Sequence, residues 1–196
     1  MTVLQALDRY YDRLARQEAV AAPGWSYEPI GVVLELAEDG TLLAVESRLD
    51  SRGKPRPARV PKWFTRSGTG STPNFLWDNA AYVLGLGAKD PGKTARDHAA
   101  FKTLRLKELS EETDPGLLAL RHFLEQWNPN SRLPPGMGEK QLILNMGFRL
   151  RGDERLLTDR PAALPHVERL SSAEAFDVEG FCLVRGERLP LVRLHP

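Results

Sequence analysis

Three pairs of apolar runs, each pair separated by a short polar turn that contains glycine, constrain the fold of this chain more than any other feature. Residues 30–36 and 41–46 flank a turn that ends in Asp39 and Gly40, residues 141–150 and 156–157 flank a turn at 151–154, and residues 181–184 and 189–194 flank a turn at 185–188. Glycine adopts the positive φ that tight turns require, so each pair predicts an antiparallel hairpin.

Amphipathic helices are predicted between and around these hairpins. Apolar residues recur at three- and four-residue steps over residues 2–18, 94–109 and 115–127, and a short helix is expected over 161–170. Strands and helices do not alternate along the chain as they do in βαβ proteins. The 196 residues therefore predict a single α+β domain, in which antiparallel β-hairpins pack with several helices.

The net charge of +1 conceals a strong asymmetry along the chain. Residues 1–46 hold 3 Lys/Arg and 8 Asp/Glu, a net charge of −5, and residues 108–196 hold 11 and 14, a net charge of −3. Residues 47–107 hold 13 and 4, a net charge of +9. Because clustered positive charge attracts polyanions, the middle third of the chain predicts a nucleic-acid partner.

The positive charge is densest in a segment that prolines interrupt. Six cations and no acid lie in this segment: Arg52, Lys54, Arg56, Arg59, Lys62 and Arg66. Pro55, Pro57 and Pro61 lack the backbone donor that a central strand needs, so we expect an exposed basic loop at about 48–73. The six cations are predicted to bind DNA phosphates.

A glycine-rich run joins this basic loop to a predicted helix. Thr72 and Pro73 are the expected N-cap and first residue of a helix that continues to Gly85. Glycines let the backbone approach a groove of DNA, and hydroxyl and amide groups hydrogen-bond base edges. Base readout is therefore predicted for Gly68, Thr69, Gly70, Ser71, Thr72 and Asn74, with Asn74 as the first candidate. A mobile, solvated loop is the alternative, in which Trp63 and Phe64 anchor the loop rather than stack on bases.

Residues 87–94 match the phosphate-binding pattern G-x-x-x-x-G-K-[ST] through Gly87, Gly92, Lys93 and Thr94. Such a site needs a buried strand before the loop, a parallel sheet around it and a carboxylate on a second strand. Only the helix after the loop is predicted here. A P-loop nucleotide-binding enzyme is therefore the alternative function, and a solvated turn before a capped helix is the simpler interpretation.

The remaining residues predict no enzyme, metal or cofactor. The histidines (His98, His122, His166 and His195) and Cys182 have no metal-ligand spacing, and no Ser-His-Asp arrangement is present. Acidic residues at 108–114 can either hold a cation or form a solvated loop. A single cysteine, and the lack of an apolar run long enough for a membrane span, predict a soluble cytoplasmic protein.

Short blocks over nearly the whole chain carry a resemblance to a known family. They are LQAL at 4–7, YY at 10–11, PGWS at 23–26, PNFLWDNAAYVLG at 73–85, FLEQW at 123–127, CLV at 182–184, GE at 186–187 and RLHP at 193–196. In these blocks the chain resembles the N-terminal part of the large subunit of type I-C Cascade, the RNA-guided DNA surveillance complex of CRISPR systems. Arg185 stands where this family is expected to have threonine.

The resemblance implies a non-catalytic module that binds double-stranded DNA in antiviral defence. In this family the large subunit recognises the protospacer-adjacent motif, helps to open the duplex for the guide RNA, and contributes to recruiting a helicase-nuclease. The implied partners are double-stranded DNA, guide RNA, the other Cascade subunits and that helicase-nuclease, without a membrane. Because the family's subunit is several hundred residues long and this chain stops straight after a β run, we expect residues 1–196 to be its N-terminal domain, with the C-terminal part absent.

Overall fold

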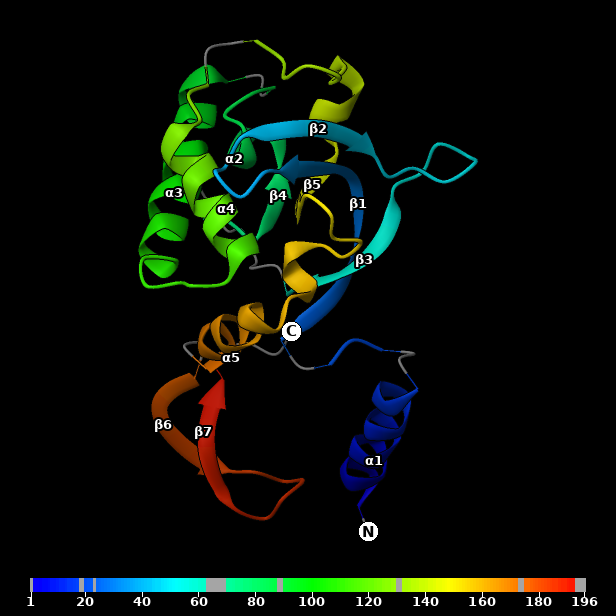
Figure 1. Cartoon of the computed structure of the whole chain (residues 1–196). Helices are drawn as coiled ribbons and strands as arrows, with labels where there is room; N and C mark the ends of the chain where they lie inside the picture. The colour runs from blue at the N-terminus through cyan, green and yellow to red at the C-terminus, as the bar shows by residue number, and fades with distance from the viewer. Residues whose placement is uncertain are drawn as a thin grey trace.

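A computed structural model describes residues 2–17, 20–22, 24–62, 70–87, 90–129, 132–172 and 175–192 (Figure 1). Its helices are α1 (Val3–Arg16), α2 (Ala80–Val83), α3 (Pro91–Glu108), α4 (Pro115–Gln126) and α5 (Leu164–Ser172), with 3-10 helices η1 (Glu139–Ile143), η2 (Leu157–Asp159) and η3 (Pro161–Ala163). Its strands are β1 (Trp25–Leu36), β2 (Leu42–Ser47), β3 (Arg56–Pro61), β4 (Trp77–Asn79), β5 (Asn145–Leu150), β6 (Ala175–Phe181) and β7 (Arg188–Val192). The predicted α+β class is confirmed. Among the described residues, none of the helices has both the length and the apolar character needed to cross a lipid bilayer.

A mixed sheet with β1 at its centre forms the frame of the molecule. β1 pairs antiparallel with β2 and β3 and parallel with β5, and β5 also pairs antiparallel with β4. The long strand β1 reaches three neighbours because residues 25–30 pair with β3, residues 32–36 pair with β2, and β5 pairs along the other edge from Ile30 to Leu36. The end of β2 and the start of β3 therefore extend beyond the helical layer (Figure 1).

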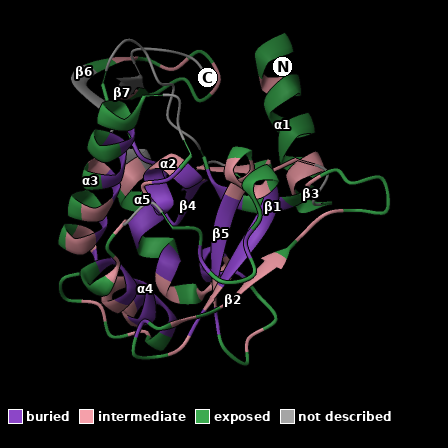
Figure 2. Ribbon diagram, turned by 90° about the horizontal axis from the view of Figure 1, so that it is seen from above, coloured by how far each residue is buried: buried purple, intermediate pink, exposed green. Residues whose placement is uncertain are grey.

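The strands β1, β4 and β5 are largely buried (Figure 2), and apolar side chains pack on both faces of the sheet. On one face, Val32 and Leu34 belong to a large cluster with Phe101, Leu120 and Phe123 from helices α3 and α4. Side chains alternate along a strand, so the neighbouring Val33 faces the other way. It belongs to a second cluster, which contains Ile30, Ala58, Val60, Trp77 and Leu156. The second cluster lies beneath the edge strand β3 and fixes its position.

Most of the predicted helices and two of the three hairpins are confirmed. Helices α1, α3, α4 and α5 fall at the predicted places, and β1 and β2 form the first hairpin around Gly40, which has φ 86°. The third hairpin exists as β6 and β7, but its first strand is Ala175–Phe181, so residues 182–184, predicted as strand, belong to the connection between the two strands. The second hairpin is wrong: after β5 the chain turns into η2, and the buried Leu156 and Leu157 cover the sheet instead of extending it.

The helix predicted from Thr72 to Gly85 is wrong over its first half. Trp77 begins β4, and only residues 80–83 are helical, with Asn79 as the N-cap in place of Thr72. Leu76 has φ 62°, a left-handed conformation that no helix contains. Residues 75–77 are three consecutive buried side chains, so packing in the core outweighs the helical spacing of the sequence.

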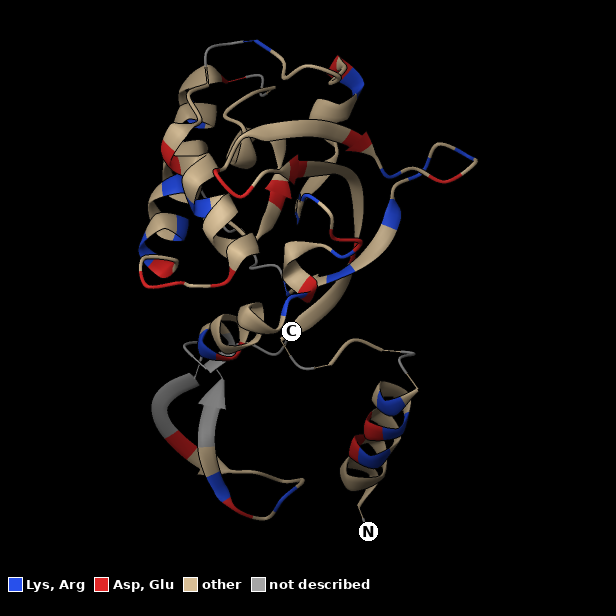
Figure 3. Ribbon diagram, in the orientation of Figure 1, with Lys and Arg blue, Asp and Glu red and all other residues tan. Residues whose placement is uncertain are grey.

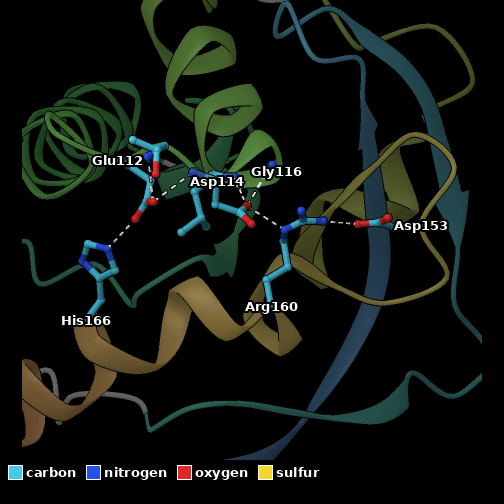
Figure 4. Close-up of polar contacts among 8 residues, drawn as sticks. Glu112, Asp114, Gly116, Asp153, Arg160 and His166 are labelled. Carbon is cyan, nitrogen blue, oxygen red and sulfur yellow. Dashed lines mark hydrogen bonds and ion pairs between the residues drawn. The ribbon is translucent and has the colours of Figure 1, made fainter.

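The acidic residues that follow α3 join the helical layer to the segment after β5 (Figure 4). Glu112 binds His166 at 3.0 Å, and Asp114 caps α4 by accepting from Gly116 at 2.9 Å. Arg160 donates to Asp114 at 2.6 Å and also pairs with Asp153. Burial alone would raise the pKa of Asp114, but the Arg160 guanidinium and two backbone N–H groups hold it below its usual value. Protein groups therefore bind Glu112 and Asp114, two of the acidic residues at 108–114 that were expected to form a solvated loop or hold a cation.

Candidate nucleic-acid interface

The connection between β2 and β3 projects from the sheet as a basic tip, residues 49–55 (Figure 3). Leu49 and Pro55 form an isolated bridge, and the Asp50 carboxylate accepts from the backbone N–H groups of Arg52 at 2.8 Å and Lys54 at 2.9 Å. These bonds give the tip a defined shape. The side chains of Arg52 and Lys54 are exposed, and neither forms an ion pair with another described residue.

The next six residues correct the prediction that residues 48–73 form a loop, because residues 56–61 form the edge strand β3. Pro57 and Pro61 are tolerated here because their missing N–H groups would face the outer edge of β3, where no other described strand pairs. Carbonyl groups of alternate residues point the same way, and three in a row accept side-chain hydrogen bonds: Pro57 from Arg48 at 3.0 Å, Arg59 from Thr158 at 3.4 Å and Pro61 from Trp77 at 2.9 Å. The strand is therefore held firmly although it has one strand neighbour, β1.

Arg59 is oriented by an aromatic ring. Its guanidinium carbon lies 4.0 Å from the ring centroid of Trp25 on β1, close enough for a cation–π interaction. Arg59 is exposed, and no ion pair links it to a described residue. Its charge is therefore available to a ligand, and its position is set by the two strands.

An open cavity of about 510 Å³ lies beside β3, and we call it the arginine groove. Five arginines line it: Arg48, Arg56, Arg59, Arg149 and Arg155. Two of them have fixed partners. Arg149 pairs with Glu35 at 2.6 Å and with Glu46, and the hydrogen bond to Glu35 raises its pKa. Arg48 donates to backbone carbonyls of β3, and burial lowers its pKa.

The structure brings together five of the six cations predicted to bind phosphate. Arg52 and Lys54 lie on the basic tip, Arg56 and Arg59 on β3, and Lys62 directly after it, and all five are exposed. Arg66 lies outside the described residues. Sequence reasoning missed Arg155, which is about a hundred residues away in the chain. It joins this surface because η2 packs against β3, and no sequence signal pointed to that contact.

The residues predicted to read bases are less accessible than the cations. Gly68 and Thr69 lie outside the described residues, while Gly70 and Thr72 are exposed. Ser71 is half-buried and donates to Asp97 at 2.6 Å. Asn74 is 4% exposed, and its side-chain oxygen has no hydrogen-bond partner among the described residues.

The backbone of Asn74 is held from two sides. Its N–H donates to the Asp78 carboxylate at 2.9 Å, and its carbonyl accepts from the buried Arg105 at 3.4 Å. In this conformation a base edge does not reach the Asn74 amide. Readout by Asn74 therefore requires residues 70–74 to move.

The residues that match the phosphate-loop pattern cap a helix. Asp90 accepts from the backbone N–H of Lys93 at 3.1 Å, and the Thr94 hydroxyl donates to the Asp90 carbonyl at 3.0 Å. The Lys93 ammonium pairs with Asp97 at 2.6 Å. The element before this segment is α2, in place of the buried strand that a phosphate loop follows. Residues 88 and 89 lie outside the described residues.

A comparison with protein families places this geometry in context. The family model of the CRISPR-associated protein Cas_Csd1 matches residues 7–196, which include the basic tip, β3 and the arginine groove. The chain belongs to this family. Membership confirms the resemblance found in the sequence and implies a role in CRISPR interference. A comparison with curated protein sequences found no match.

Proposed function

We propose that the chain is a non-catalytic, double-stranded DNA-binding module of a type I-C interference complex. It recognises the protospacer-adjacent motif and helps to start opening of the duplex, next to the guide RNA, the other Cascade subunits and the recruited helicase-nuclease. One observation carries the proposal within this family: exposed cations without ion-pair partners among the described residues line one stiff hairpin, at Arg52, Lys54 and Arg56. Cations held in this way can bind successive phosphates without first breaking internal ion pairs.

Removing four of these cations tests the proposal. With Arg52, Lys54, Arg56 and Lys62 all changed to alanine, we expect affinity for duplex DNA to fall about a hundredfold at low salt. The variant neutralises fewer phosphates and so releases fewer counterions from the DNA when it binds. The slope of log affinity against log salt should become shallower by about three to four. Fluorescence anisotropy over a salt series measures both.

The matched control removes the same charge elsewhere. Arg16, Arg96, Lys107 and Lys140 are exposed and lie outside the basic tip and β3. Their change to alanine should leave the salt slope nearly unaltered. If both sets of four lower the slope equally, the chain binds DNA through its general charge, and the proposed interface is contradicted.

Sequence readout is proposed for residues 68–74, with Asn74 contributing after the segment has moved. In the assembled guide-RNA complex, we expect Asn74→Ala to flatten the preference among duplexes whose flanking bases are randomised, because a lost amide removes hydrogen bonds to one base pair. Sequencing the bound fraction gives the preference. Equal weakening on every sequence would instead assign Asn74 to holding its segment against Arg105.

A further inference from the structure

We propose that the arginine groove seats a backbone phosphate of the bound DNA duplex, with Arg155 as a phosphate-binding residue and Asp159 as a built-in competitor of the phosphate. The inference rests on the proposed function and extends it to a segment outside the basic loop. It assigns a role to the turn between β5 and η2, which carries Arg155, and to η2 itself, which ends at Asp159.

The groove joins segments that are far apart in the sequence. Arg56 and Arg59 come from β3, and Arg155 comes from the turn after β5. The Thr158 hydroxyl donates to the Arg59 carbonyl at 3.4 Å, so η2 and β3 are held together at this point. A duplex that contacts the basic tip and β3 therefore also passes Arg155.

The charges of the groove favour an anion. Its five arginines and three carboxylates give a formal net charge of +2. One carboxylate, Glu46, is already paired with Arg149. The guanidinium groups of Arg56, Arg59 and Arg155 form no ion pair with any described residue, so they remain available.

Three arginines lie near a single carboxylate, Asp159, without forming an ion pair with it among the described residues. Arg59, Arg155 and Arg48 each act electrostatically on Asp159, which is half-buried, and burial raises its pKa despite them. No ion pair joins Asp159 to these arginines within the described part of the chain. Guanidinium groups that surround an open space suit a phosphodiester, whose two charged oxygens each accept hydrogen bonds.

The composition of the groove indicates a backbone phosphate rather than a base. Among the described residues that line it, none is aromatic, so there is no ring on which a nucleobase can stack. Arg56 and Leu49, which also line the groove, lie at the two ends of the basic tip, so the groove adjoins it. Its contribution should therefore be the same for every DNA sequence.

Two neighbouring substitutions should change affinity in opposite directions. Arg155→Ala should weaken binding of a duplex of fixed sequence about tenfold, because it removes a charged hydrogen-bond donor. Asp159→Asn should strengthen binding about threefold, because it removes a negative charge close to the phosphate while keeping the shape of the side chain. Arg151→Ala is the matched control, since Arg151 is exposed on the same turn and does not line the groove.

Fluorescence anisotropy with duplex DNA and with RNA of the same length separates the outcomes. A folding defect lowers affinity in both variants, so a gain with Asp159→Asn together with a loss with Arg155→Ala supports the groove. Unchanged binding by Arg155→Ala, weaker binding by Asp159→Asn, a loss that depends on DNA sequence, or an effect confined to RNA would each overturn it. If the fourfold variant of the basic tip and β3 still loses affinity in that case, the proposed function stands without the groove.

Discussion

Replacing Arg105 with leucine is expected to lower the free energy of unfolding by about 3–5 kcal/mol. Arg105 is 1% exposed, and its guanidinium carbon lies 5.0 Å from the ring centroid of Phe75. Its Nη2 pairs with Glu108 at 3.0 Å. Leucine keeps much of the apolar packing but leaves the Glu108 carboxylate mostly buried without its cation, which is the larger cost. Equilibrium unfolding in urea measures the change.

The pH dependence of this loss identifies its cause. Burial raises the pKa of Glu108 above its ordinary 4.5 although Arg105 opposes the shift, and burial lowers the pKa of Arg105 to about 10. A carboxyl with a raised folded pKa contributes stability below its unfolded pKa, and that contribution is lost as pH rises through the folded pKa. Without Arg105 the pKa of Glu108 rises further. The deficit of Arg105→Leu, measured against the native chain at each pH, should therefore be smaller near pH 4.5 than at pH 8.

The double variant Arg105→Leu, Glu108→Leu is the control for this explanation. Replacing both members of a buried ion pair with apolar residues often costs little, so the double variant should recover most of the stability that the single variant loses. A single variant whose deficit is the same at both pH values, or a double variant less stable than the single one, would contradict a buried charge as the cause.

Arg105 also connects the core to the proposed interface. Its Nη1 donates to the Asn74 carbonyl, and the N–H of Asn74 donates to Asp78 at the start of the β4–α2 segment. These contacts hold residues 74–79 in a conformation that includes the left-handed Leu76. Strained backbone of this kind persists where the surrounding structure fixes it. Movement of residues 70–74 toward DNA would thus work against a specific set of buried bonds.

Local chemistry made several elements predictable from the sequence. Asp39 and Gly40 indicated the first hairpin, and Asp114 followed by Pro115 indicated the start of α4, where the Asp114 side chain caps the helix. These signals depend on a few neighbouring residues, so they can be recognised from the sequence alone. The parallel pairing of β1 with β5 has no such signal, because it joins Val33 to Gly147 across more than a hundred residues.

The edge strand β3 and the accessibility of Asn74 could not be predicted for a related reason. Prolines in residues 55–61 indicate a loop unless their missing N–H groups face the outer edge of a sheet. The outward carbonyls of β3 are held by Arg48, Thr158 and Trp77, which lie in other segments. An asparagine after a glycine-rich run is expected at the surface. Its burial follows from Phe75 and Leu76, which draw the segment into the core. Composition located the cations, and tertiary contacts determined which other residues join them.

Changing Gly40 to alanine is expected to lower the free energy of unfolding by about 3 kcal/mol or more. Gly40 has φ 86°, and an added Cβ would lie 2.3 Å from the backbone nitrogen of Phe123 and 2.5 Å from the carbonyl carbon of His122. These are main-chain atoms of α4 and cannot turn aside as a side chain would. The β1–β2 turn is also fastened to α4, because Gln126 donates to the Asp39 carbonyl at 2.7 Å.

Gly53, in the basic tip, provides the comparison that separates conformational strain from the clash with α4. It has φ 74°, and an added Cβ would meet nothing within 4 Å, so Gly53→Ala should cost only the strain of the left-handed conformation, about 1 kcal/mol. Urea unfolding of both variants gives the difference. If Gly40→Ala lowers the free energy of unfolding no more than Gly53→Ala does, the β1–β2 turn does not pack closely against α4. The hairpin leading to the basic tip would then be attached to the helical layer less firmly than its contacts with His122 and Gln126 indicate.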